Sequence, residues 1–187
     1  MLKEPAFGLQ NGGWIEVICG CMFSGKTEEL IRRIDQAKLA NQSIIVFKPV
    51  FDTRYHQLNV VSHNAMWLEA TPVRNAREIL SLALNADVVG IDEAQFFDQE
   101  IVEICNQLAN VGKRVIVVGL DMDYAGRPFG PMPNLMAIAE FVTKLHAICA
   151  KSGEMASYSF RKSTTKDEKV LGEKELYEPR SRNFFYD

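Results

Sequence analysis

The fold is decided by the stretch Gly20-Cys21-Met22-Phe23-Ser24-Gly25-Lys26-Thr27, which fits the pattern GxxxxGK[ST]. An apolar run typical of a buried strand, residues 14–18, comes directly before it, and a helical pattern over residues 28–40 follows. Glycines in such a loop let backbone N–H groups surround phosphate oxygens at a helix N-terminus. The motif in this context predicts a phosphate-binding loop, in preference to a glycine-rich turn that only caps a helix.

Strands and helices continue to alternate after this loop. Further apolar runs without strict alternation are typical of strands buried on both faces and cover residues 43–47, 87–91 and 114–120, with a fifth possible strand within 141–149. Helical patterns cover residues 74–84, 98–111 and, more briefly, 135–139. Asp98 is a plausible N-cap and Gly112 a plausible stop for the longest of these. We expect an α/β P-loop (RecA-like) core over residues 1–149, with a parallel sheet flanked by helices.

The composition changes after residue 149. Residues 150–187 are rich in Lys, Glu, Ser and Arg and poor in aliphatic side chains, so this segment cannot offset its ordering entropy alone. It is expected to be a small appended flap that packs on the core or on a ligand. The alternative is a floppy tail.

Length and charge exclude several classes of protein. The chain has 187 residues, 47% of them apolar, and a formal net charge of -3, which argues against electrostatic capture of nucleic acid or of an anionic membrane. Its four cysteines form no CxxC pair, and there is neither a signal-peptide pattern nor an apolar run long enough to span a bilayer. We expect a cytoplasmic protein without nucleic-acid or membrane partners.

Two motifs carry the predicted chemistry. In the phosphate-binding loop, Lys26 would reach the terminal phosphates and Thr27 would offer its hydroxyl to Mg²⁺. Asp92 and Glu93 follow the run 87–91 at the edge where such sheets bind ligands. Asp92 suits a magnesium site reached through water, and Glu93 suits a base for an attacking hydroxyl or water. The alternative for Glu93 is a cap or ion pair near the next helix.

Weaker signals lie near this edge. Arg54 could neutralise a transferring phosphoryl group, although a surface ion pair with Asp52 is about as plausible. Apolar and aromatic side chains that could stack on a flat ring come from Met22, Phe96, Phe97, Leu120, Tyr124 and Phe129. Each of these taken alone could equally be a core residue. His56, His63 and His146 lack metal-ligand spacing, and none is assigned to a metal.

These residues together resemble the type II thymidine kinases. The likeness covers nearly the whole chain through the following stretches: residues 20–27, Asp52-Thr-Arg54-Tyr, Ser62-His63, Ile91-Asp-Glu-Ala-Gln-Phe-Phe97, Gly119-Leu-Asp-Met-Asp-Tyr124 with Pro128-Phe129, and Gly153 to Arg161. It implies transfer of the γ-phosphate of ATP to the 5′-hydroxyl of thymidine or deoxyuridine. Glu93 then resembles the catalytic base, with Lys26 and Arg54 beside it, and Asp92 the acid that supports Mg²⁺.

The resemblance also implies roles for other residues. Gln95 and Asp52 join residues 20–27 on the donor side. The thymidine side would comprise Met22, Phe96, Leu120, Tyr124, Phe129 and Tyr177. The C-terminal flap corresponds to the family's lasso, residues 150–187, which contacts the base through main-chain groups that match Glu168, Lys169, Val170, Leu171 and Gly172. A homotetramer and feedback inhibition by dTTP are further implications of the family.

One departure from the family concerns zinc. Relatives hold the lasso with zinc on four cysteines, but only Cys149 remains, because Ser152, Ser181 and Phe184 occupy the other positions. Serine is a poor zinc ligand and phenylalanine is none, so we predict no structural zinc. Our hypothesis is that packing of residues 184–186 replaces it and leaves the lasso more mobile without ligand than in relatives with zinc.

Two other classes of protein remain in competition with a nucleoside kinase. A P-loop ATPase acting on nucleic acid would require a basic face, which the net charge does not favour. A module that only senses nucleotides would not need a base beside the metal-binding acid, so Glu93 favours chemistry.

Overall fold

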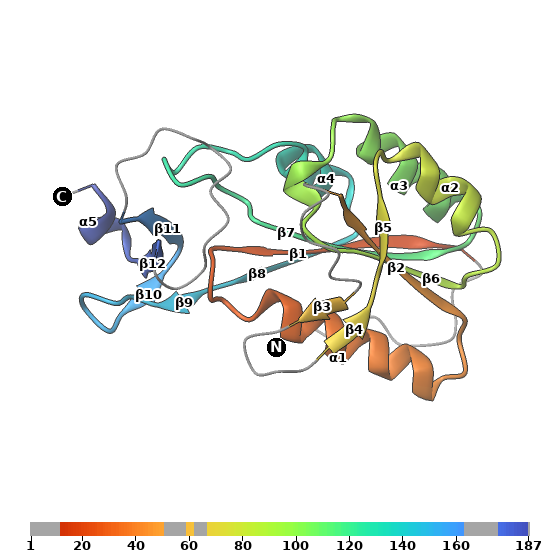
Figure 1. Cartoon of the computed structure of the whole chain (residues 1–187), viewed down its shortest axis with the longest axis horizontal. Helices are drawn as coiled ribbons and strands as arrows, with labels where there is room; N and C mark the ends of the chain where they lie inside the picture. The colour runs from red at the N-terminus through yellow and green to blue at the C-terminus, as the bar shows by residue number, and fades with distance from the viewer. Residues whose placement is uncertain (1–11, 51–58, 62–66, 163–175, 187) are drawn as a thin grey trace.

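A six-stranded parallel sheet forms the centre of the molecule (Figure 1). The computed structural model describes residues 12–50, 59–61, 67–162 and 176–186. In spatial order the strands are β5 (Thr71–Val73), β2 (Ile44–Pro49), β6 (Val88–Ile91), β7 (Arg114–Gly119), β1 (Trp14–Gly20) and β8 (Phe141–Leu145). The expected α/β core with a parallel sheet is confirmed.

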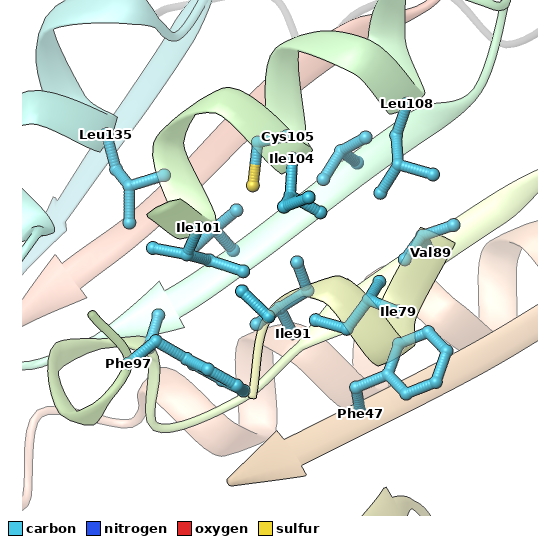
Figure 2. Close-up of a cluster of buried hydrophobic side chains, with 14 of the residues drawn as sticks. Phe47, Ile79, Val89, Ile91, Phe97, Ile101, Ile104, Cys105, Leu108 and Leu135 are labelled. Atoms are coloured by element: carbon cyan, nitrogen blue, oxygen red, sulfur yellow. The ribbon is translucent and has the colours of Figure 1, made fainter. Parts of the chain in front are cut away.

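Helices cover both faces of this sheet. One face is covered by α1 (Lys26–Leu39), and the other by α2 (Arg77–Leu82), α3 (Glu100–Asn110) and α4 (Met132–Ile138) (Figure 1). Strand side chains alternate between the faces, which divides the core in two. Figure 2 shows the larger half, where Ile101, Ile104 and Leu108 of α3 pack over Val89 and Ile91 of β6.

Local signals set the ends of the helices. Asp98 caps α3 as expected, since its Oδ1 accepts a hydrogen bond from the backbone N–H of Glu100 at 3.0 Å. At the other end Gly112 has φ +89, and the N–H of Lys113 returns to the carbonyl of Leu108, which is a Schellman stop. Helix α1 begins at Lys26, two residues before the expected start, because the end of the phosphate-binding loop is already its first turn.

Other boundaries differ from the sequence prediction. The run 141–149 is two strands, since β8 ends at Leu145 and β9 (Ala147–Ile148) pairs with β10 (Met155–Ala156) in a separate small sheet. The edge strand β5 was not predicted, because it has three residues and contains Pro72. The predicted helix 74–84 is shorter, and the predicted helix 135–139 begins earlier, at Met132.

Small elements complete the described chain. β3 (Asn59–Val61) pairs with β4 (Trp67–Glu69), and β11 (Tyr158–Arg161) pairs with β12 (Tyr177–Arg180), both antiparallel. The 3₁₀ turn η1 (Ala94–Phe96) follows β6, and α5 (Arg182–Phe185) ends the chain. Strands β9–β12 and α5 gather at one end of the molecule, beyond the end of β8 (Figure 1). Across the described ranges, no helix is long and apolar enough to cross a membrane.

A charged cluster is buried between α1 and the sheet. Glu16 of β1 is 0% exposed and lies 2.7 Å from Arg33 of α1 and 2.6 Å from Arg114 of β7. Trp14 donates a hydrogen bond to the same carboxylate, and Arg33 also donates to Thr143 of β8. Burial by itself would raise the pKa of Glu16, but the hydrogen bonds and charges of these partners outweigh it and lower the pKa. The cluster thus connects β1, β7 and β8 to one another and to α1.

Candidate active site

The phosphate-binding loop joins β1 to α1 and has the backbone of an anion cradle. Phe23 has φ +64 and Gly25, which borders α1, has φ +85, so both adopt the left-handed conformation. Gly20 is required by space, because a Cβ there would lie 2.2 Å from the carbonyl oxygen of Leu145 on β8. Successive N–H groups in such conformations form a concave site for anions.

Two polar side chains of the loop are available to bind a ligand. The Nζ of Lys26 donates a hydrogen bond to the loop's own carbonyl at Cys21, 2.8 Å away. Burial lowers the pKa of Lys26, while the nearby carboxylates of Glu93 and Asp92 oppose that shift. The Oγ of Ser24 is buried and has no hydrogen-bond partner among the described residues. An orphaned hydroxyl and a self-bonded lysine fit a loop that closes on a polyanion.

Two adjacent carboxylates stand where β6 ends. Asp92 is 6% exposed, and burial, followed by the charge of Glu93, raises its pKa to about 7. Glu93 has φ +53, so the chain kinks there and its side chain is exposed while that of Asp92 is buried. The N–H of Glu93 donates to Oδ1 of Asp92 at 2.9 Å. The kink separates a buried acid from an accessible one within two residues.

Gln95 connects Glu93 to the end of β7. It is 2% exposed, its Nε2 donates a hydrogen bond to Oε2 of Glu93, and its Oε1 accepts the N–H of Leu120 at 3.0 Å. Gly119 makes room for it, because a Cβ there would lie 2.8 Å from Oε1 of Gln95. The family resemblance puts Gln95 on the donor side, and in the structure its hydrogen bonds orient Glu93 and the start of the loop after β7.

The aromatic candidates for the thymidine side make contacts with each other and with the C-terminal strands. Phe96 and Phe129 meet edge to face, with ring centroids 5.4 Å apart. Tyr124 lies under the guanidinium of Arg161, 5.1 Å from its ring centroid, and Tyr177 of β12 pairs with Arg161 in the sheet. Phe97 is different, because it is 7% exposed and belongs to the core (Figure 2). For Phe97 the core interpretation is thus right.

Two polar residues near the loop were not assigned a role from the sequence. Ser159 of β11 is 4% exposed, and its Oγ accepts a hydrogen bond from the N–H of Met22 at 3.0 Å. Asp121 follows β7, is 7% exposed, and pairs with Lys144 at 2.7 Å. Both stand in the motifs that carried the family resemblance. Only the fold shows that they lie at the site, since 137 positions separate Ser159 from Met22.

The predicted site residues Asp52, Arg54 and 168–172 lie outside the described residues, and so do His56 and His63, which were assigned no role. Of the histidines, His146 is described, and its Nδ1 lies 3.1 Å from the Oγ of Ser157.

The position predicted to lack zinc has a distinctive thiol. Burial would raise the pKa of Cys149, but hydrogen bonds from the side chain of Ser152 and from the backbone of Ser181, Ser152 and Lys151 lower it to about 6. Phe184, at another of the positions that the family resemblance implied for zinc, is 38% exposed. Within the described ranges no group of three or more His, Cys, Asp or Glu side chains could hold a metal ion. The absence of zinc stays a prediction.

Comparisons with known proteins agree on one family. The family model for thymidine kinase matches residues 13–185. A thymidine kinase of Rhodothermus sp. (strain ITI 518) is 60% identical over 187 residues, covering 99% of this chain and 88% of the relative. A thymidine kinase of Bacteroides fragilis is 55% identical over 173 residues, covering 92% of this chain and 87% of the relative. One of Porphyromonas gingivalis is 54% identical over 173 residues, with 92% and 85% covered.

Proposed function

This chain belongs to the thymidine kinase family and is an enzyme that phosphorylates thymidine, and on that premise we propose how its residues carry out the transfer. The donor is ATP, and its γ-phosphate passes to the 5′-hydroxyl of thymidine, with deoxyuridine as a second acceptor. Residues 20–27 hold the donor phosphates. Glu93 acts on the acceptor hydroxyl.

On the donor side, loop N–H groups and the N-terminus of α1 surround the phosphates, and Lys26 leaves the carbonyl of Cys21 to contact them. The orphaned Oγ of Ser24 supports this reading, because it would gain a partner. Thr27 and, through water, Asp92 would hold Mg²⁺. When bound, Mg²⁺ supplies positive charge that stabilises the transferring phosphoryl group. The phosphate-side loop with Asp52 and Arg54 completes this half of the proposal.

On the acceptor side, Glu93 orients the 5′-hydroxyl and accepts its proton late in the transfer, since a free alcohol is too weak an acid to lose it earlier. The observation that carries this proposal is the kink at Glu93, which exposes its carboxylate beside the buried Asp92. Gln95 supports the role, because its hydrogen bond fixes one oxygen of Glu93.

The thymine ring is proposed to lie among Met22, Phe96, Leu120, Tyr124 and Phe129, with Tyr177 and residues 168–172 of the lasso closing over it. The T-shaped pair of Phe96 and Phe129 and the half-buried Leu120 support an apolar slot for a flat ring. A covered slot would also exclude water from the phosphoryl transfer.

The test is Glu93→Gln in the full chain, with Mg²⁺-ATP and thymidine. We expect kcat to fall about 10²- to 10⁴-fold, because the amide cannot accept the proton, while ATP binding measured by calorimetry stays the same. Glu103→Gln is the matched control, since Glu103 is exposed on α3 and bonds only to Gln107 among the partners described for it.

Two outcomes would contradict the proposal. An unchanged kcat in Glu93→Gln removes Glu93 from the mechanism. ADP formed without nucleoside monophosphate, when the wild-type enzyme receives an equimolar mixture of the four deoxynucleosides, contradicts the transfer itself.

Finer properties follow from the family alone and are part of the proposal: a homotetramer, feedback inhibition by dTTP, a cytoplasmic location, and a division into a core of residues 1–149 and a lasso of residues 150–187. Light scattering and inhibition by dTTP at fixed thymidine test the first two. The pairing of β11 with β12 in a sheet separate from the central one supports the division.

A further inference from the structure

The last helix of the described chain, α5, has a single turn and cannot be stable on its own. Contacts with β11 and β12 fix it. The guanidinium of Arg180 lies 3.2 Å from the ring centroid of Phe160 and donates a hydrogen bond to the carbonyl of Phe184 at 2.9 Å. Arg182 lies 5.2 Å from the ring centroid of Tyr158. These contacts give the end of the chain one position.

From that position, the last aromatic side chains reach β11. Phe185 stacks on Tyr158 with ring centroids 4.5 Å apart, and Tyr186 meets both rings edge to face, at 5.7 Å from Tyr158 and 5.0 Å from Phe185. Such pairs are worth about 0.5–1.5 kcal/mol each beyond the area that they bury. Phe184, the neighbouring residue, makes no ring contact within the described part of the chain.

The same three rings converge on Gly126. A Cβ on Gly126 would lie 3.0 Å from Phe185, 3.2 Å from the hydroxyl of Tyr186 and 3.4 Å from Tyr158. Gly126 has φ +74 and forms the tip of the loop that connects β7 to α4. The end of the chain therefore packs directly on a loop that starts about sixty residues earlier, at Leu120.

Internal hydrogen bonds hold that loop together, so a contact that fixes its tip also fixes the position of its base. Oδ1 of Asp123 accepts the N–H groups of Ala125 and Arg127, and the N–H of Asp123 returns to the carbonyl of Arg127. Met122 and Pro128 form a β-bridge below the tip. Tyr124 belongs to this unit and is touched a second time by β11, through Arg161.

We propose that Phe185 and Tyr186 form a latch on Gly126 and are positioning residues for the nucleoside, because they hold the loop that carries Tyr124 and Phe129. The inference rests on the proposed thymidine slot. It assigns Phe185 and Tyr186 to the acceptor side of the reaction and leaves the donor side independent of them. Within the expected packing of residues 184–186, it singles out the rings of Phe185 and Tyr186, since among the described residues Phe184 contributes its carbonyl to Arg180 and makes no ring contact.

The experiment compares Phe185→Ala with Phe184→Ala in the full chain. Phe185→Ala removes the ring contacts of Phe185 with Tyr158, Phe160 and Tyr186, so we expect it to raise the KM for thymidine at least about tenfold. The KM for ATP and kcat at saturating thymidine stay at wild-type values. Phe184→Ala changes none of these, and Phe185→Tyr restores the KM for thymidine because a ring can stack again.

Other outcomes would overturn the proposed latch or the proposed function. An unchanged KM for thymidine in Phe185→Ala overturns the latch, and so does an equal rise in both KM values, which would indicate general loosening. If Phe185→Ala fails to fold, Phe185→Leu keeps most of the volume without the stacking and serves the same test. Failure of the wild-type enzyme to phosphorylate thymidine would contradict the proposed function instead, before any variant is compared.

Discussion

Both ends of the central sheet bury a carboxylate, but the pKa of the carboxylate shifts in opposite directions at the two ends. At the start of β1, Glu16 lies between Arg33 and Arg114, and its pKa is lowered. At the end of β6, Asp92 lies beside a second carboxylate, Glu93, and its pKa is raised to about 7. At the first end, ion pairs outweigh the cost of burying Glu16, whereas at the second the charges of Lys26 and Lys48 do not outweigh the burial of Asp92 and the charge of Glu93.

This contrast distinguishes the structural ion-pair cluster around Glu16 from the candidate active site around Asp92. Burial alone does not, because Glu16 and Asp92 are 0% and 6% exposed. The difference lies in the partners that each carboxylate meets. Strained or poorly compensated groups collect where a protein binds and reacts, and the rest of the fold has to stabilise them.

Glu16→Gln is the change expected to have the largest effect on stability. It removes the anion that Arg33 and Arg114 share inside the fold, although Arg33 keeps its ion pair with Glu29 at 2.7 Å, so the free energy of unfolding should fall by about 3–5 kcal/mol. Urea denaturation measures this, with Glu103→Gln on the exposed face of α3 as control. A loss below about 1 kcal/mol, typical of a surface pair, would show that the cluster is not a structural anchor.

A smaller effect of opposite sign is expected for Asp92→Asn. The amide keeps the hydrogen bond from the N–H of Glu93 but removes a buried charge next to a like charge. Without nucleotide or Mg²⁺ the unfolding free energy should rise by about 1 kcal/mol, and turnover should be lost. Thermal unfolding and a kinase assay on the same sample check both. A less stable variant would mean that Lys26 and Lys48 already balance Asp92.

The smallest effect concerns acid pH. Since the folded-state pKa of Glu16 is below its ordinary value of 4.5, the contribution of Glu16 to stability is complete above pH 4.5 and is lost as the pH falls through the folded-state pKa. The difference in unfolding free energy between wild type and Glu16→Gln should therefore shrink below pH 4.5. A constant difference would show that the charge of Glu16 is not what stabilises the cluster.

Local sequence signals predict the core of this fold well. The phosphate-binding loop, the strands on either side of the sheet's centre, and the cap and stop of α3 all depend on residues within a few positions of each other. The short strand β5 and the end of β8 at Leu145 cannot be predicted from such local signals. Pro72 weakens the strand signal, and the apolar run 141–149 contains little that marks where the chain leaves the central sheet.

The candidate site divides in the same way. Lys26, Asp92 and Glu93 can be proposed from the sequence because each stands in or next to a motif at the end of a predicted strand. Ser159 and the Phe185 latch cannot, since each contacts a partner far away in the sequence, Met22 in one case and Gly126 in the other. Contacts of this kind depend on how the C-terminal strands pack, which no local pattern encodes.

The strand order has a consequence for how the chain is made. β1 is the first strand to be synthesised, yet its neighbours are β7 and β8, with Trp14 in register with Arg114 and Glu16 with Phe141. At a ribosomal rate of about 5–20 residues per second, β7, the first strand that pairs with β1, is synthesised about 5–20 s after β1. During that time an apolar strand is unpaired, so the nascent chain is a natural client for chaperones. A polypeptide released before β8 would lack one side of the nucleotide loop.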